Sequence, residues 1–195
     1  MISIVQANLK RGFDLVLSLI LLPFLIIPIF ALIMLATVDT KQWGLFSQQR
    51  VGQYGKLFCI FKIRTLKNEP HQLGSLKRSA TRFGIFLRDT KLDELPQLFN
   101  VVLGQMSFVG PRPDIAGFAD NLKGDDRIIL RVKPGITGPA TLKYKNEEVI
   151  LFKQDDPETY NRTIIWPDKV KINKNYVMTW SFSLDLKHIL KSILN

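Results

Sequence analysis

The chain has 195 residues and a formal net charge of +10, with 27 lysines and arginines against 17 aspartates and glutamates. This length suits one domain plus an anchor, and the charge favours an anionic partner such as acidic lipid, nucleic acid or a phosphorylated substrate. The single cysteine, Cys59, excludes an internal disulfide, and His71 and His188 are too few to predict a metal cluster. Any bound metal would be a hard, oxygen-liganded ion.

The N-terminal part contains a membrane segment. Residues 15–38 carry no charge and, as a helix, are long enough to cross a hydrocarbon core of roughly 30 Å. Pro23 and Pro28 interrupt this run, and Pro28 leaves two arms that are each too short to cross alone. Lys10 and Arg11 precede the run and further basic residues follow it, so charge favours neither orientation of a spanning helix. Two alternatives stay open: a kinked helix that spans the membrane, and a helix that enters and returns on the same side.

A β-hairpin is predicted next. Residues 45–51 and 56–64 alternate in the manner of strands on either side of a Gly-Gln-Tyr-Gly turn. In the second strand the two-residue period puts Lys62 and Arg64 on one face, which could meet phosphate or solvent. A short helix around residues 83–87 follows, and its aromatic side could lie at a membrane interface or pack on the core.

The most informative stretch is residues 91–113, which starts with two adjacent acids. We expect a helix from Glu94 to Leu103 with Asp93 as its N-cap, ending at Gly104. Negative charge is favoured at a helix start, so Asp93 should stay ionised. The simpler alternative is that Asp93 only caps the helix and that Glu94 is solvated.

An arginine between two prolines closes this stretch, in Val-Gly-Pro-Arg-Pro at 109–113. The prolines fix the backbone on both sides of Arg112 and hold its guanidinium against a defined point. A rigid loop follows at 133–139, punctuated by proline and glycine. The C-terminal residues 186–194 form an amphipathic basic helix, which could lie on acidic lipid or cover the core.

Several of these segments carry a resemblance to a known family. Residues 92–98, Leu-Asp-Glu-Leu-Pro-Gln-Leu, and 106–113, Met-Ser-Phe-Val-Gly-Pro-Arg-Pro, resemble the hallmark of the bacterial sugar transferases, the monotopic polyprenol-phosphate phosphoglycosyl transferases. Lys-Arg-Gly-Phe-Asp at 10–14 is similar to the family's opening motif. Phe-Lys-Ile-Arg-Thr at 61–65 and Lys-Pro-Gly-Ile-Thr-Gly at 133–138 are similar to two further family segments.

The resemblance implies an α/β, mostly helical fold in two parts. Residues 1–40 would form a re-entrant membrane helix, and residues 41–195 a small cytosolic catalytic domain with a β-hairpin and interfacial amphipathic helices. The protein would be monotopic, on the cytoplasmic face of the bacterial inner membrane. Ile27-Pro28 stands where the family has a Ser-Pro pair at the helix break. The residues expected at the membrane re-entry are Pro28, Lys10, Arg11 and Asp14.

The resemblance also implies a reaction. The family moves a phosphosugar from a UDP-sugar to polyprenol (undecaprenyl) phosphate, which releases UMP and starts a glycoconjugate or polysaccharide. Asp93 would be the covalent nucleophile, Glu94 would assist it, and both would hold Mg²⁺. The residues expected to bind phosphate are Lys62, Arg64, Arg88 and Arg112. Membrane lipids are further expected partners, and a homodimer stays open.

Two other functions remain alternatives at this point. A non-enzymatic basic protein, anchored to the membrane, would use its charge for binding alone. Proteins that bind single-stranded nucleic acid have aromatic residues interleaved with basic ones, and no part of this sequence concentrates such residues. No nucleic-acid partner is therefore expected. A one-step glycosyltransferase would release UDP instead of UMP. Pro139 stands where the family commonly has tryptophan, which leaves the sugar open.

Overall fold

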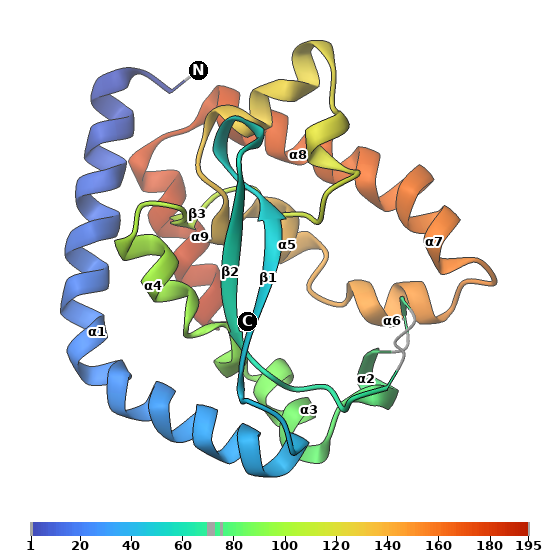
Figure 1. Ribbon diagram of the computed structural model, residues 1–195. Coiled ribbons are helices and arrows are strands. Elements are labelled where there is room, and N and C mark those ends of the chain that lie inside the picture. The colour runs from blue at the N-terminus through green and yellow to red at the C-terminus, as the bar shows by residue number, and fades with distance from the viewer. Residues whose placement is uncertain (1, 70–72, 75, 195) are drawn as a thin grey trace.

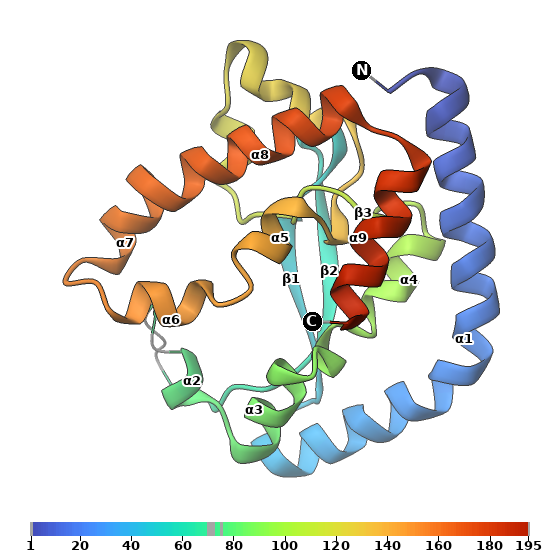
Figure 2. The same ribbon diagram turned by 180° about the vertical axis from the view of Figure 1, so that it is seen from behind.

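The computed structural model describes residues 2–69, 73–74 and 76–194, and the predicted mostly helical fold with a small hairpin is confirmed (Figures 1 and 2). The elements from the N-terminus to the central turn are α1 (Ile4–Thr40), β1 (Leu45–Val51), η1 (Gln53–Gly55), β2 (Leu57–Ile63), α2 (Leu76–Ser79), α3 (Arg82–Asp89) and η2 (Leu92–Glu94). The elements that follow are α4 (Gln97–Val102), β3 (Ser107–Val109), η3 (Ala119–Asn121), η4 (Gly124–Arg131), β4 (Gly135–Thr137), α5 (Pro139–Lys143), α6 (Glu147–Phe152), α7 (Pro157–Tyr160), η5 (Asn161–Ile165), α8 (Trp166–Thr179) and α9 (Phe182–Leu194).

The helix α1 is long, apolar and bent. It starts at a capping box, in which Ser3 Oγ accepts a hydrogen bond from Gln6 N and the Gln6 side chain accepts one from Ser3 N. It is long and apolar enough to cross a membrane. Figure 1 shows that it bends about halfway along its length. Pro23 and Pro28 lie inside it, and the N–H groups that they lack explain the bend.

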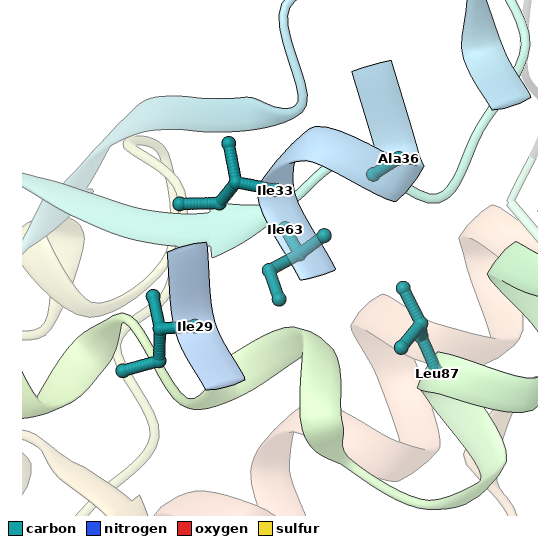
Figure 3. Packing of buried hydrophobic residues seen from close by; sticks show 5 residues of the cluster. All are labelled: Ile29, Ile33, Ala36, Ile63 and Leu87. Carbon is teal, nitrogen blue, oxygen red and sulfur yellow. The ribbon is translucent and has the colours of Figure 1, made fainter. Parts of the chain in front are cut away.

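Both halves of α1 attach to the rest of the protein. The first half runs beside α4 and β3, and the second turns beneath the hairpin towards α3 (Figures 1 and 2). Ile29, Ile33 and Ala36 form a buried cluster with Ile63 of β2 and Leu87 of α3 (Figure 3). Large apolar side chains on the outer face of α1 are exposed, among them Val16, Leu19, Phe24, Ile27 and Phe30. The helix therefore contributes to the core with one face and presents an apolar surface with the other.

The strands β1 and β2 pair antiparallel, with Leu45 opposite Ile63 and Val51 opposite Leu57, which confirms the predicted hairpin. A second pair was not predicted: β3 and β4 run parallel, with Ser107 opposite Gly135. The loop that the sequence indicated at residues 133–139 therefore contains a short strand.

Three glycines allow this second pair to form. A Cβ atom at Gly135 would lie 2.1 Å from Gly110 N, and one at Gly138 would lie 2.2 Å from Gly110 O. No side chain fits at such distances, so these two backbone segments can touch only where both carry glycine. The contact joins the Pro-Arg-Pro segment rigidly to β4 and the start of α5.

A buried polar network joins the two ends of the chain. The Asp185 carboxylate of α9 accepts hydrogen bonds from Lys10 Nζ (2.5 Å), Tyr176 OH (2.6 Å) and Trp180 Nε1 (3.0 Å). These donors belong to α1, to α8 and to the residue that follows α8. The network holds one face of α9 against the protein, while Leu190 and Ile193 on its other face are exposed. The helix therefore covers the core, which is one of the two alternatives, and its outer face exposes apolar side chains.

Candidate active site

Asp93 and Glu94 lie in η2, a tight turn before α4. The predicted helix from Glu94 to Leu103 with Asp93 as N-cap is wrong at its start, because α4 begins at Gln97 and Pro96 occupies its N-cap position. The preceding residues bond from i to i+3 as in a 3₁₀ turn. Proline has no N–H to close an α-helical bond back into this turn. The turn buries both carboxylates, which are 6% and 7% exposed.

Glu94 is held between two cations. Its Oε1 accepts a hydrogen bond from Lys62 Nζ at 3.0 Å and another from Arg112 Nη2, while its Oε2 lies 3.4 Å from Arg112 Nη1. Burial alone would raise the pKa of Glu94, but Arg112 and Lys62 together lower it well below its ordinary range. Glu94 is therefore ionised at neutral pH and fixes the two cations beside it.

Asp93 has a different environment. Its Oδ1 is buried and has no hydrogen-bond partner among the described residues. Burial raises the pKa of Asp93, and the neighbouring Lys62 and Arg88 charges partly offset that rise. A buried carboxylate oxygen without a partner is destabilised in its charged form. Asp93 is thus a buried carboxyl group, one oxygen of which has no hydrogen-bond partner among the described residues.

Two local features hold this arrangement in place. Asn100 of α4 is fully buried, accepts a hydrogen bond from Phe61 N (3.1 Å) and donates one to Cys59 O (2.7 Å), which fixes α4 against β2 close to Lys62. On the other side, Gly110 N donates to Thr137 O at 2.9 Å next to the Pro-Arg-Pro segment. The sequence indicated the prolines around Arg112 but not this second support.

The other two predicted phosphate-binding residues lie differently. Arg88 Nη2 is 3.1 Å from Glu148 Oε2 of α6 and stands close enough for its charge to lower the pKa of Asp93. Arg64 follows the last residue of β2, donates from Nε to Trp43 O at 2.9 Å and stacks on the Phe46 ring. The structure therefore brings Lys62, Arg88 and Arg112 to the carboxylates and does not bring Arg64 there.

The residues predicted for the membrane re-entry attach α1 to the domain. Arg11 donates to Val101 O (2.6 Å) and Val102 O (2.9 Å) at the end of α4, and Lys10 bonds to Asp185. The Asp14 carboxylate accepts from the N–H of the residue in the middle of β3 at 3.1 Å. Pro28 lies inside the second half of the helix. The first turns of α1 are thus bound to the elements that carry the active site.

Sequence reasoning missed a second charged group beside Arg112. Burial raises the pKa of Asp114 to about 6, against the opposing charges of Lys169, Arg50 and Arg112. Lys169 Nζ also bonds to Glu147 of α6 at 2.6 and 2.7 Å. Asp114 could have been suspected because it directly follows Pro-Arg-Pro. Lys169 could not, since nothing near it in the chain marks it.

The donor set suits a hard metal ion that is shared with a substrate. Within the described residues, no group of three or more His, Cys, Asp or Glu side chains could hold a metal by itself. Mg²⁺ often binds to one or two carboxylates, several waters and substrate phosphates. The unpartnered Oδ1 of Asp93, next to Glu94, meets that requirement.

The sequence is similar to those of known proteins. The family model described as "Bacterial sugar transferase" matches residues 5–195. An uncharacterized sugar transferase, EpsL of Bacillus subtilis, is 34% identical over 182 residues, which cover 92% of this chain and 82% of EpsL.

Two longer relatives carry functional names. An undecaprenyl-phosphate glucose phosphotransferase of Komagataeibacter xylinus is 34% identical over 94% of this chain and 35% of the relative. A UDP-glucose:undecaprenyl-phosphate glucose-1-phosphate transferase of Klebsiella pneumoniae is 34% identical over 94% of this chain and 39% of the relative. This chain thus spans well under half the length of either. With nearly all of its residues matched by the family model, the chain belongs to the bacterial sugar transferase family.

Proposed function

We propose that this protein transfers a phosphosugar from a UDP-sugar to polyprenyl phosphate through a covalent intermediate on Asp93. Relatives named undecaprenyl-phosphate sugar phosphotransferases support the general reaction. The observation that carries the covalent step is the Asp93 carboxylate, buried and with one oxygen unpartnered among the described side chains, beside cations that are held by Glu94. Such a carboxylate is ionised above its pKa and needs no base to attack.

The proposed reaction has two displacements at phosphorus. In the first, an Asp93 oxygen attacks the phosphorus that carries the sugar, the bond from that phosphorus to the bridging oxygen breaks, and UMP leaves. In the second, an oxygen of polyprenyl phosphate attacks the same phosphorus and the Asp93 carboxylate leaves. The product is a polyprenyl diphosphate sugar, and the enzyme regains its starting form.

The cations would stabilise charge on the phosphoryl oxygens. Arg112 and Lys62 are already fixed by Glu94, so they need little reorganisation when a diphosphate binds. Arg88 would exchange its contact with Glu148 for a phosphate oxygen. Mg²⁺, held by Asp93 and Glu94, would neutralise part of the charge of the diphosphate.

We further propose that α1 is re-entrant and that the protein lies on the cytoplasmic face of the inner membrane. Both halves of α1 contact the same compact body, which favours a helix that returns to the side where it entered. Its exposed outer residues would contact lipid acyl chains. A lipid acceptor and a soluble nucleotide sugar would then meet at the membrane surface.

The test is intact-protein mass spectrometry after incubation with a panel of UDP-sugars and Mg²⁺, without lipid. The wild type is expected to gain one phosphosugar and release UMP, and Asp93→Asn to do neither. Asparagine keeps the shape of the side chain and removes a charge that is costly to bury, so this variant should fold. Asp126→Asn, which changes a half-exposed aspartate paired with Lys174, is the matched control and should behave as wild type.

Other outcomes would favour the alternatives. Release of UDP would indicate a one-step glycosyltransferase, and a fully active Asp93→Asn protein would refute the covalent mechanism. If no UDP-sugar supports transfer and the protein only binds lipid, a basic membrane-anchored binding protein would be favoured.

A further inference from the structure

A cavity of about 220 Å³ lies between α1, the η2 turn, β4 and α5. It is far larger than the roughly 30 Å³ that one water molecule occupies in the liquid. One part of its wall carries the charges of Glu94 and Arg112. Another part is apolar and includes Leu21 and Leu25 of the membrane helix together with Ile136 of β4. A ligand that fits this wall has an anionic end and an apolar end.

Two hydroxyl groups in the wall also indicate that the ligand has a polar, anionic end. Thr137 is 7% exposed, and the buried Oγ1 atoms of Thr137 and Thr141 both have no hydrogen-bond partner in the described part of the chain. Buried hydroxyls are normally hydrogen-bonded, so a pair without partners on the wall of a cavity indicates a polar group of a ligand. Hydroxyl donors together with a guanidinium suit phosphate oxygens.

We propose that this cavity binds the phosphate and the first isoprene units of the polyprenyl phosphate acceptor. Thr137, Thr141 and Arg112 would bind its phosphate, while Leu21 and Leu25 would contact its chain. The inference rests on the proposed function and assigns one part of the site to one of the two substrates. The sugar nucleotide fits less well, because a sugar against leucine side chains would lose hydrogen bonds to water without replacing them.

The surroundings of the cavity support a lipid. Part of its apolar wall belongs to α1, on which the neighbouring side chains Leu19, Ile20 and Phe24 are exposed. An acyl or prenyl chain in contact with that helix could therefore remain in an apolar environment up to the cavity. Gly110, which precedes Pro-Arg-Pro, contacts both Gly135 and Gly138 on either side of Thr137. Thr137 and Arg112 thus belong to two backbone segments that are packed closely together at these glycines.

The second displacement of the proposed function would bring the bound acceptor to Asp93. Glu94, which follows Asp93 directly in the chain, lines the cavity beside Arg112. An acceptor oxygen held there would attack the phosphorus on Asp93, forming one P–O bond while the bond to the aspartate oxygen breaks. The acceptor phosphate is an anion already, so no base is needed.

The experiment measures the two half-reactions separately in the full chain. The variant is Thr137→Val with Thr141→Val, because valine keeps the size of threonine and removes only the hydroxyl. The KM for polyprenyl phosphate is expected to rise about tenfold, and the loss in the lipid step to exceed any loss in phosphosugar loading. Thr179→Val, an exposed threonine at the end of α8, is the matched control and should leave both steps as in the wild type.

A binding measurement identifies the ligand independently of turnover. Purified wild type should bind farnesyl phosphate more tightly than inorganic phosphate or farnesol, and the double variant should lose most of this preference. Equal binding of inorganic phosphate would reduce the cavity to an anion site, and equal competition by phosphatidate vesicles would make it a general lipid site. Either result overturns the assignment.

The two proposals fail in different ways. If the wild type loads no phosphosugar from any UDP-sugar, the proposed function fails and this assignment fails with it. If the wild type turns over normally and the double variant keeps the acceptor KM while slowing the loading step, the cavity belongs to the donor and only the present inference is wrong.

Discussion

At the scale of single residues, two adjacent carboxylates have different environments because different groups surround them. Glu94 accepts hydrogen bonds from Lys62 and Arg112 and stays ionised. Asp93 keeps one oxygen without a partner among the described residues, and burial raises its pKa. An oxygen that is engaged by a cation is a weaker nucleophile than one that is not. Under the proposed function, this difference makes Asp93 the nucleophile of the pair.

This difference predicts a pH dependence of phosphosugar loading. Asp93 attacks only when ionised, so the loading rate should fall as the pH drops through its pKa, which lies above the ordinary value of 3.8. Lys62 lowers that pKa, so Lys62→Met should move the fall in rate to higher pH. The measurement is the rate of UMP release against pH in the absence of lipid.

The control for this shift is Lys56→Met, which removes an exposed lysine from the same hairpin and should leave the profile unchanged. A profile for Lys62→Met that stays in place, or moves to lower pH, would mean that Asp93 is not the titrating nucleophile.

The site residues illustrate how far the sequence could predict them. The motif at 92–98 indicated Asp93 and Glu94 as site residues. Both are buried in the η2 turn, which is unusual for carboxylates and consistent with that prediction. Alternation along the second strand put Lys62 and Arg64 on one face, but β2 ends at Ile63, so the two-residue period no longer applies to Arg64. The Arg64 side chain then follows the turn of the backbone towards Trp43.

At the scale of elements, α1 combines a bend with attachments at both of its halves. Arg11 bonds to the end of α4, whereas Ile33 and Ala36 pack on the hairpin and α3. A straight spanning helix would carry its two ends to opposite sides of the bilayer. The contacts of both halves with one compact body support the proposed re-entry.

Cysteine labelling tests this topology. In a Cys59→Ser background, Val5→Cys and Trp43→Cys place exposed thiols near the two ends of α1. We expect a membrane-impermeant maleimide to label both from the same side as Lys56→Cys, which marks the domain. Labelling of the two ends from opposite sides would establish a spanning helix and refute re-entry.

The sequence predicted those elements that depend on neighbouring residues in the chain. The apolar run of α1 and the alternation of the hairpin were both readable, and both were found. The parallel pairing of β3 with β4 was not, because each strand is three residues long and its partner is remote in the chain. The start of α4 was misplaced because Pro96 suits the first turn of an α-helix as well as the end of a 3₁₀ turn.

At the scale of the whole molecule, the Lys10–Asp185 pair ties the first turns of the chain to its last helix. Asp185→Asn should cost about 3 kcal/mol of unfolding free energy, because it leaves the buried Lys10 ammonium without the carboxylate that accepts its hydrogen bond. Lys10→Met in the same protein should recover much of that loss. The measurement is a double-mutant cycle by denaturant unfolding in detergent.

Additive effects of the two substitutions, to within about 0.5 kcal/mol, would show that the pair is not coupled in the folded state. Lys187→Met, on the same helix as Asp185 and exposed, is the matched control and should change stability little.

The packing of α1 on Ile63 and Leu87 also determines whether another membrane anchor could replace this helix. Many membrane anchors can be exchanged for any apolar helix of the same length, since they only hold a domain at the bilayer. Here Ile29, Ile33 and Ala36 close the core of the domain itself. Fusing residues 41–195 to a foreign anchor would uncover that core, so we expect such a fusion to be less stable than the intact chain. Substitutions on the exposed side of α1 should therefore be interchangeable among apolar residues, whereas those on its inner side are limited by shape.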